Sequence, residues 1–536
     1  MALRYRSLYP FLFAAVRVLF LGVNNSGNYD LDDLLLVLLV TQAGVMILYL
    51  LAWVTLARFG EDVPALATLV VVAWLIVSPA VEEWFPELLR QLPLVLVGLG
   101  GVASVLLIVG LAARPATLRL GARLLTLVYL LLAVWLGRDI ARDRADDQRQ
   151  VAASPLVRDL ARPIPSRPAA GGPLRDIYVI MLDEYANAAT LRAVLGFDNS
   201  AFVDSLRALG FRVPRAVRSN YTQTSLSLAA FLNAAHVYRI EQELPPGSTD
   251  AVLINHLVEY NRVARYARAR GYRFVFFPSS WWYATRWSPI ADSVVEVDTS
   301  FSIGREMSRT EFRTALWHNS MVAWFHREEE GAGKIVRGTL EGLGRLPADR
   351  RPVFAFAHVL SPHVPYVFDS TCREREHVWK RHPAGYTAQL QCVNRLVLAM
   401  VTRLLAESEV QPVIILQGDH GTAFLEYSSA GNPTRVHPTA AGERFGAFGA
   451  YLLPGGGAAA FGDTVTVVNV LGHVLRTYLG ADLPLEADDQ YLSVDPSPFD
   501  LHRVRPTWPG LGDTGAARSP ILTGGGRVVP QAGAAR

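Results

Sequence analysis

The sequence is poor in cysteine and in net charge. Cys372 and Cys392 are its two cysteines, and they have neither the C-x-x-C spacing of metal sites nor a redox motif around them. The formal net charge is only +3, and no basic run is interleaved with aromatic residues, which excludes a nucleic-acid partner. No internal repeat is evident, and no small-residue cleavage site marks a signal peptide.

Apolar residues are abundant instead, at 51% of the chain with a mean hydropathy of +0.22. They are concentrated in the first quarter, in segments that are each close to the length of a bilayer span. We therefore predict a five-helix transmembrane domain over residues 1–140. The segments cover residues 8–24 (which include Arg17), 33–57, 63–80, 92–112 and 120–137.

The loops between these segments differ in charge. Arginines occupy one set of loops (Arg4, Arg6, Arg58, Arg114, Arg119 and Arg123), whereas the other set is mainly acidic (Asp30, Asp32, Asp33, Glu82, Glu83 and Glu87). By the positive-inside rule the arginine-rich loops are cytoplasmic, so the chain after about residue 138 lies outside. This predicts a multi-pass protein of a bacterial-type plasma (inner) membrane with its large domain on the extracytoplasmic side.

The pattern of the chain after the apolar segments predicts an α/β domain. Residues 141–174 are charged and then rich in proline and glycine, which predicts an exposed linker. Over residues 175–485, short apolar runs alternate with helical patterns, which indicates a mostly parallel sheet. We expect a loose C-terminal extension over residues 486–536, whose end is rich in glycine, proline and alanine. The apolar runs are Ile177–Leu182, Phe274–Phe277, Val353–Val359 and Val413–Leu416.

One polar stretch, residues 219–225, runs directly into a predicted helix. Thr224 or Ser225 is placed to cap the first turn of that helix. A hydroxyl at this point lies beside the free N–H groups and the positive end of the helix, which favour a phosphate and an alkoxide. The alternative is that Thr224 is only a helix cap.

Polar groups follow three of the predicted strands: Asp183 and Glu184, then His358 and His363, then Asp419 and His420. The carboxyl ends of parallel strands line one crevice, so these groups should converge there. Two aspartates, a histidine and the hydroxyl of Thr224 would suit Zn²⁺ or Mn²⁺ in an open, catalytic site. The alternatives are that Asp183 is a cap, that Glu184 is the ligand in its place, and that the histidines are ordinary loop residues.

These motifs resemble the alkaline phosphatase and sulfatase superfamily, in particular its membrane-anchored branch of lipoteichoic acid synthases and lipid A phosphoethanolamine transferases. The resemblance covers residues 175–480, and the expected helical anchor also matches. It implies an alkaline-phosphatase-like α/β domain. The matching stretches are Tyr178–Asp183, Thr222–Ser225, His363–Tyr366 and Asp419–Gly421.

The resemblance also implies roles for the residues. Thr224 would be the nucleophile, and a divalent metal, Zn²⁺ or Mn²⁺, would be held by Asp183, Thr224, Asp419 and His420. His363 would contact the substrate or a second metal, with His358 and His437 as further candidates for substrate binding. His437 is the nearest match to a histidine that the family places soon after Asp-His-Gly, although the intervening loop is longer here.

The expected function is transfer of a phosphoryl-alcohol group, of the phosphoethanolamine or phosphoglycerol type, from a membrane lipid donor to an envelope glycan or lipid acceptor through phosphothreonine. The alternatives are a phosphoesterase or atypical sulfatase, and a catalytically silent membrane scaffold. A standard sulfatase needs a C/S-x-P-x-R stretch, which neither cysteine has. Outside the membrane a Cys372–Cys392 disulfide is allowed, with two free thiols as the alternative.

Overall fold

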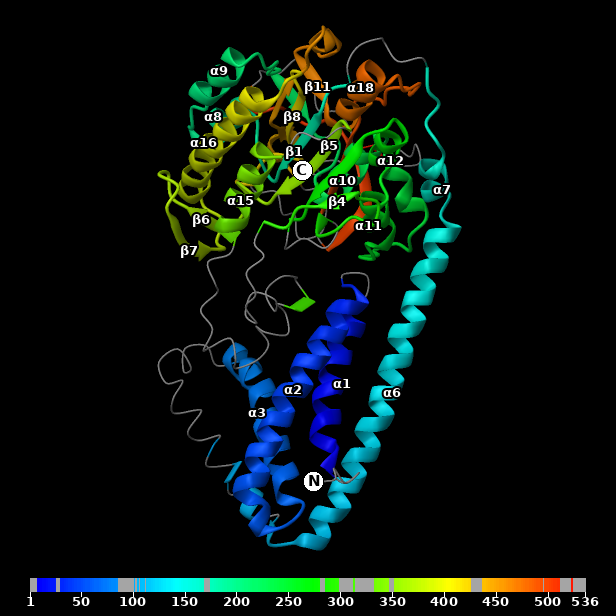
Figure 1. Cartoon of the computed structure of the whole chain (residues 1–536), viewed down its shortest axis with the longest axis vertical. Helices are drawn as coiled ribbons and strands as arrows, with labels where there is room; N and C mark the ends of the chain where they lie inside the picture. Colours follow the sequence, from blue (N-terminus) through cyan, green and yellow to red (C-terminus); the bar gives the residue numbers. More distant parts are fainter. Residues whose placement is uncertain are drawn as a thin grey trace, which may run out of the picture. The chain divides into compact units, whose positions relative to one another are not determined.

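The computed structural model describes residues 7–25, 29–84, 101, 104–105, 107–110, 112–167, 174–279, 285–297, 312–313, 332–346, 351–425, 436–494, 496–510 and 522–523. The chain forms two compact units. The first contains Met1–Arg149 and Phe301–Glu329, and the second contains Gln150–Ser300 and Glu330–Arg536. Figure 1 follows the chain through both of them.

The first unit is helical. Its elements are α1 (Tyr9–Asn24), α2 (Leu31–Leu56), the 3₁₀ turn η2 (Ala57–Phe59), α3 (Val63–Trp84) and α6 (Pro115–Ala153). Among the described residues, two helices are long and apolar enough to cross a membrane, Leu31–Phe59 and Pro115–Ala153, while Tyr9–Asn24 and Val63–Leu75 are shorter apolar helices. Most of the segment expected at 92–112 lies outside the described residues. The five-helix membrane domain therefore stays a prediction.

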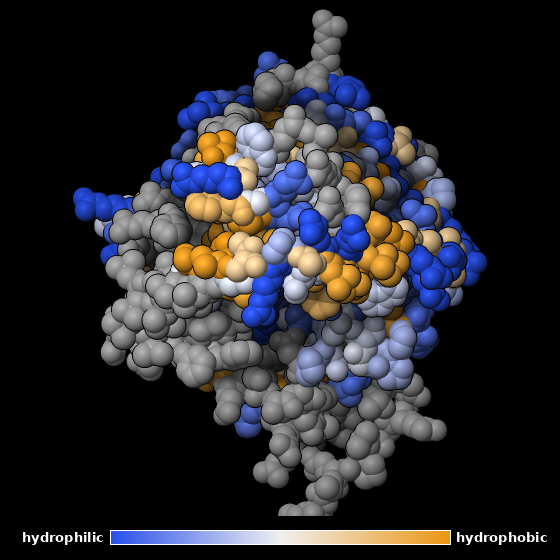
Figure 2. All heavy atoms as spheres, turned by 90° about the horizontal axis from the view of Figure 1, so that it is seen from below, coloured by the Kyte–Doolittle hydropathy of each residue, from blue (hydrophilic) through white to orange (hydrophobic). Residues whose placement is uncertain are grey.

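The two long helices expose large apolar side chains. On α2, Leu39 and Val54 are 68% and 76% exposed, and on α6 Leu131 and Val134 are about as exposed. Figure 2 shows hydrophobic side chains at the surface on the face that it presents. In water this much exposed apolar surface would be unfavourable, and it is typical of a helix that contacts lipid.

Helix α6 runs further than the composition indicated. The charged residues assigned to a linker continue this helix to Ala153, and α7 (Pro155–Ala161) follows after Ser154. Charged pairs within the helix, such as Arg142 with Asp146, support this part of it. The first helix-breaking residue is Pro155, and at the start of α7 a proline is well tolerated. High charge was thus mistaken for irregular structure.

The second unit is built on a six-stranded sheet of order β10-β8-β1-β5-β3-β4. All neighbouring strands in it are parallel except β10 with β8, which confirms the predicted α/β class with a mostly parallel sheet. The four predicted apolar runs correspond to β1, β3, β5 and β8. The strands are β1 (Ile177–Leu182), β3 (Arg273–Phe277), β4 (Ser293–Val294), β5 (Val353–Val359), β8 (Val413–Gly418) and β10 (Gly449–Leu452).

Both faces of this sheet are covered. Alternate side chains of β1 enter two separate hydrophobic cores. Ile177 and Val179 lie in the first core, and Tyr178 and Ile180 lie in the second. A strand buried on both sides has to be apolar throughout, which explains its unbroken hydrophobic run. The first core packs against α10 (Thr224–Asn233), α11 (Val252–Glu259), α12 (Arg262–Ala269) and α18 (Val467–Leu479); the second packs against α8 (Ala188–Leu195), α9 (Ser200–Ala208), α15 (Ala332–Gly344) and α16 (Pro383–Glu407).

Smaller elements surround this sheet. A disulfide joins Cys372, which precedes β7, to Cys392 in α16, so the pairing allowed by the sequence is present. The remaining elements are β2 (Ala216–Arg218) with β9 (Gly446–Ala447) and β11 (Thr464–Thr466), β6 (Tyr366–Phe368) with β7 (Glu374–Val378), α17 (Pro438–Phe445), and the 3₁₀ turns η3 (Tyr238–Gln242) and η7 (Gly457–Ala460).

The prediction of a loose extension from residue 486 is wrong for residues 490–494 and 497–504. There β12 (Gln490–Val494) and β13 (Ser497–Val504) form an antiparallel pair, which β14 (Leu522–Thr523) joins. Leu492 and Leu501 of this sheet are buried, and the ring of Tyr491 stacks on Tyr221. The pair is ordered because it covers the loop that leads into α10.

Candidate functional site

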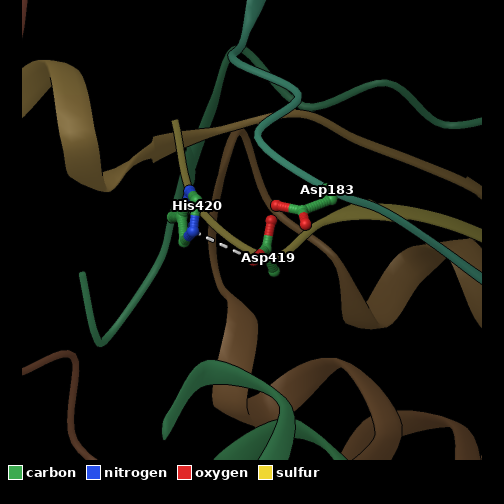
Figure 3. Close-up of side chains that lie close together, drawn as sticks. All are labelled: Asp183, Asp419 and His420. Atoms are coloured by element: carbon green, nitrogen blue, oxygen red, sulfur yellow. Dashed lines mark ion pairs between the residues drawn. The ribbon is translucent and has the colours of Figure 1, made fainter. Parts of the chain in front are cut away.

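The site lies at the carboxyl ends of three adjacent strands. Asp183 directly follows β1, His358 lies near the end of β5, and Asp419 and His420 directly follow β8. The parallel register pairs Leu182 with Gly418 across the two strands, so the aspartates that follow them meet. Figure 3 shows Asp183, Asp419 and His420 turned toward one another, and one ligand atom from each lies within 4.8 Å of the others.

Steric contacts require a glycine at position 421, in the Asp-His-Gly stretch. A Cβ atom at Gly421 would stand 2.0 Å from the backbone oxygen of Glu443 and 2.8 Å from that of Gly446. Only glycine lets the strand end approach α17 this closely. The side chain of Glu443 holds the same loop, since it accepts hydrogen bonds from Thr422 Oγ1 (2.7 Å) and from the backbone N–H groups of Phe424 and Leu425.

Thr224 is the first residue of α10. The cap position is taken by Gln223, whose side chain makes no cap hydrogen bond, so the interpretation of Thr224 or Ser225 as the cap is wrong. The hydroxyl of Thr224 instead lies 3.0 Å from His420 Nε2. A buried hydroxyl at a helix start is thus directed to the cluster, where the N–H groups of the first turn favour negative charge.

His420 presents a lone pair to this cluster. Its Nδ1 lies 3.0 Å from the backbone oxygen of Gly421, and an oxygen can only accept, so Nδ1 carries the proton. Burial, and then the charge of Arg444, lower the pKa of His420 well below its usual value. The ring is therefore neutral with Nε2 as an acceptor, the form in which histidine binds a metal. In this structure Arg444 Nη2 donates to that atom at 3.0 Å, and a metal bound there would take the place of this hydrogen bond.

The two aspartates are buried close together. Burial raises the pKa of Asp183 to about 7 against the opposing charges of Arg444 and Arg381, and burial together with Asp183 raises the pKa of Asp419 well above its usual value. Within the described chain, Asp183 Oδ1 and Asp419 Oδ2 have no hydrogen-bond partner. Such oxygens, with an imidazole nitrogen and a hydroxyl beside them, fit a divalent cation such as Zn²⁺ or Mn²⁺.

His358 and His363 also lie at the site. Thr285 donates to Ser279 Oγ (2.8 Å), so Thr285 Oγ1 accepts from His358 Nδ1 at 2.9 Å. This leaves Nε2 of His358 as the acceptor atom, 3.8 Å from Asp183 Oδ2.

His363 is held in the same way. Its Nδ1 donates to the backbone oxygen of Val364, and its Nε2 lies 3.8 Å from Glu184 Oε2. Burial lowers the pKa of both rings, that of His358 to about 3, so both are neutral.

His437 is not brought to this cluster. It is exposed at the start of α17, and its Nδ1 accepts from the backbone N–H of Thr439. None of the contacts described for it reaches Asp183, Asp419 or His420. A histidine before Pro438 acts here as a helix cap, which explains why its place in the sequence was misleading.

The sequence predicted Glu184 at this strand end but not its pairing with two arginines, Arg381 and Arg444, neither of which it predicted at the site. Glu184 is fully buried, and its carboxylate pairs with Arg381 and Arg444 instead of joining Asp183 and Asp419. Its backbone N–H donates to Asp419 Oδ1 at 2.9 Å. Arg381 precedes α16 and Arg444 lies in α17, and nothing in the spacing of either arginine relates it to the strand ends.

Comparisons with known proteins found only distant structural likeness. No family model matches the sequence, and a search of curated proteins found no match. The solved structures that resemble it include the periplasmic domain of EptC from Escherichia coli in complex with zinc, at 10% identity and a TM-score of 0.41, over 62% of this chain and 93% of that one.

Two further structures have similarly low TM-scores. The integral membrane lipooligosaccharide phosphoethanolamine transferase EptA from Neisseria meningitidis has 14% identity and a TM-score of 0.38, over 88% of this chain and 94% of that one. The lipoteichoic acid synthase LtaP from Listeria monocytogenes has 10% identity and a TM-score of 0.38, over 63% and 82%. Identities of 14% or less and TM-scores of 0.41 or less assign no activity to this chain.

Proposed function

We propose that this chain is a membrane-anchored, metal-dependent transferase of the alkaline phosphatase and sulfatase superfamily, with Thr224 as its nucleophile. The observation that carries the proposal is the position of the Thr224 hydroxyl, 3.0 Å from His420 Nε2 at the start of α10. A buried threonine that only stabilised the helix would have no need to contact a cluster of two aspartates and a histidine.

Asp183, Asp419 and His420, together with Thr224, would hold the metal. When bound, a divalent cation would lower the pKa of the threonine hydroxyl and polarise the phosphoryl oxygens. The protein's own contribution is the fixed placement of the hydroxyl and of the N–H groups of α10, which stabilise negative charge without rearranging.

The proposed reaction has two halves. In the first, Thr224 Oγ1 forms a bond to phosphorus, the bond from phosphorus to the diacylglycerol oxygen breaks, and that oxygen ends with the proton that the threonine loses. In the second, a hydroxyl of the acceptor glycan or lipid bonds to phosphorus, the bond to Thr224 breaks, and the threonine regains a proton. The donor would be a membrane lipid with a phosphoethanolamine or phosphoglycerol headgroup.

His358 and His363 would contact the substrate. Each holds its Nδ1 proton on a neighbouring oxygen and keeps Nε2 as an acceptor at the site. A neutral imidazole in this state can accept a hydrogen bond, or a proton, from the hydroxyl of an incoming acceptor. His437, exposed at its helix cap, has no part in this proposal.

The location rests on two separate features of the chain. The arginine distribution in the N-terminal loops favours an extracytoplasmic catalytic domain over residues 175–485, anchored in a bacterial-type inner membrane by residues 1–140. The Cys372–Cys392 disulfide is consistent with that side, because disulfides persist in oxidising compartments.

A transfer assay with purified, metal-loaded full-length protein tests this function. With vesicles of phosphatidylethanolamine or phosphatidylglycerol and a lipid or glycan acceptor, the protein should release diacylglycerol and modify the acceptor. Thr224→Ala should abolish both, whereas Thr224→Ser should retain part of the activity. Release of the free headgroup with no modified acceptor would indicate a hydrolase, and turnover retained by Thr224→Ala would exclude the threonine mechanism.

A further inference from the structure

Beside the Asp183, Asp419 and His420 cluster, two guanidinium groups share one buried carboxylate. Glu184 is fully buried and pairs with both Arg381 and Arg444. We infer that Glu184 positions these arginines as a clamp that binds the non-bridging oxygens of the transferred phosphoryl group. This inference rests on the proposed function and adds residues for which the transfer chemistry alone gives no role.

The position of Arg444 is fixed by backbone contacts. Its Nε donates to the oxygen of Thr222 at 3.0 Å and its Nη1 to the oxygen of Gly421 at 3.1 Å. These oxygens belong to the two loops that carry Thr224 and His420. The planar fork of an arginine, held in this way, fixes the direction of its Nη2 group.

The Nη2 group of Arg444 lies close to the proposed nucleophile, Thr224. Nη2 of Arg444 lies 3.0 Å from His420 Nε2, the same atom that lies 3.0 Å from Thr224 Oγ1. The arginine nitrogen and the threonine oxygen are therefore no more than about 6 Å apart. The oxygens of a phosphoryl group on Thr224 would therefore be within reach of this nitrogen, with which they can form charge-assisted N–H bonds of about 2.8 Å.

Arg381 supplies the second positive charge. Its side chain is 30% exposed, and burial together with the neighbouring Arg444 lowers its pKa to about 10, so it stays charged at neutral pH. Two guanidinium groups this close repel each other, and Glu184 offsets only one of their charges. An anion held between them would relieve the repulsion.

The charge balance indicates the kind of anion. Metal binding requires ionised carboxylates, and the carboxylates of Asp183, Glu184 and Asp419 with the two guanidinium groups of Arg381 and Arg444 then sum to one negative charge. A divalent cation would turn this into one positive charge. Such a site matches a phosphodiester, which carries one negative charge, and the headgroup linkage of a phospholipid is of that class.

The test measures binding of inorganic phosphate to the metal-loaded full-length protein by isothermal titration calorimetry. Arg444→Ala and Arg381→Ala should each weaken phosphate binding about tenfold or more, as expected for a lost charged hydrogen bond. Glu184→Gln should weaken it less, because both arginines remain. Arg192→Ala is the matched control, since Arg192 forms an exposed pair with Asp198 and should not change binding.

Metal content and the unfolding midpoint of every variant establish that it is folded. If Arg444→Ala does not fold, the partly exposed Arg381 decides the question. The inference is overturned if folded, metal-loaded arginine variants bind phosphate as tightly as the wild type. It is also overturned if they lose phosphate affinity yet acquire the Thr224 adduct from phosphatidylethanolamine vesicles at the wild-type rate, because the clamp would then bind only free phosphate.

The same vesicles separate this inference from the proposed function. A wild-type protein that forms no adduct on Thr224 would contradict the transferase mechanism. The arginine variants would still report, through phosphate affinity, whether the clamp exists.

Discussion

The hydroxyl of Thr224 and Nε2 of His420 lie 3.0 Å apart, although 196 positions separate these residues in the sequence. The contact depends on two close approaches. Helix α10 has to begin at Thr224, and the loop after β8 has to pass α17 at Gly421, where no side chain fits. A proposed nucleophile and a proposed metal ligand are thereby held in place by backbone packing.

Removal of one charge from the Asp183, Asp419 and His420 cluster should release the metal. Asp419→Asn replaces a carboxylate oxygen by an amide and is expected to lower zinc or manganese affinity at least 100-fold, more than the 10–100-fold typical of residues that only support ligands. Metal analysis after dialysis measures this. Asp463→Asn, at an exposed pair with Arg212, is the control. Full metal retention in Asp419→Asn would contradict the assignment of this ligand.

The stability of the metal-free protein should depend on pH through Asp183. Its folded-state pKa of about 7 lies above the unfolded value of about 3.9, so the folded state binds the additional proton between these values. Stability from this group is therefore full below about pH 4 and is lost as the pH rises through 7.

The folded-state pKa of His358 is about 3, below its unfolded value, so its contribution to stability increases as the pH rises. The wild type therefore has to be compared with Asp183→Asn, which retains His358. Across pH 4 to 7, the unfolding midpoint of the metal-free wild type should fall relative to that of the variant. Bound zinc should remove this fall. Parallel pH profiles without metal would contradict the buried, proton-binding state of Asp183.

The disulfide should stabilise the second unit. Replacing both Cys372 and Cys392 by serine opens a loop of sequence separation 20 and is expected to cost about 3 kcal/mol in the free energy of unfolding. Denaturant unfolding of both proteins measures the difference. Non-reducing mass spectrometry should find the linked peptides in the wild type, and two alkylatable thiols there would contradict the pairing.

Glu443 should be essential to the loop that follows Asp-His-Gly. It is fully buried and accepts from Thr422, Phe424 and Leu425, so Glu443→Ala leaves buried donors without a partner and is expected to cost about 3 kcal/mol. Glu443→Gln keeps one acceptor oxygen and should cost less. Thermal unfolding ranks the two variants, and equal midpoints for all three proteins would contradict this role.

The sequence was sufficient to predict the parallel strands and the side chains that gather at their carboxyl ends. A strand buried on both faces has to be continuously apolar, and polar residues directly after such a strand have few other places to lie than the crevice at its end. Asp183 and Asp419 are of this kind, and the structure brings them together as expected.

Other residues depend on contacts that no local pattern records. Arg444 reaches His420 only because α17 packs back onto the strand end, and Glu184 turns away from Asp183 because its backbone adopts a φ of 61°. His437 looked like a site residue but caps a helix, and the sheet at β12 and β13 is stabilised by contacts with the loop before α10. Local composition, which indicated a loose tail, contains no information on such contacts.

The central claim is the covalent role of Thr224, and intact mass spectrometry tests it most directly. Full-length, metal-loaded protein is incubated with phosphatidylethanolamine vesicles in the absence of an acceptor, and then digested and sequenced. The account predicts a phosphoethanolamine mass on Thr224 and none in Thr224→Ala. Folded, metal-loaded wild-type protein that releases diacylglycerol but shows no adduct, or an adduct on another residue, would contradict it.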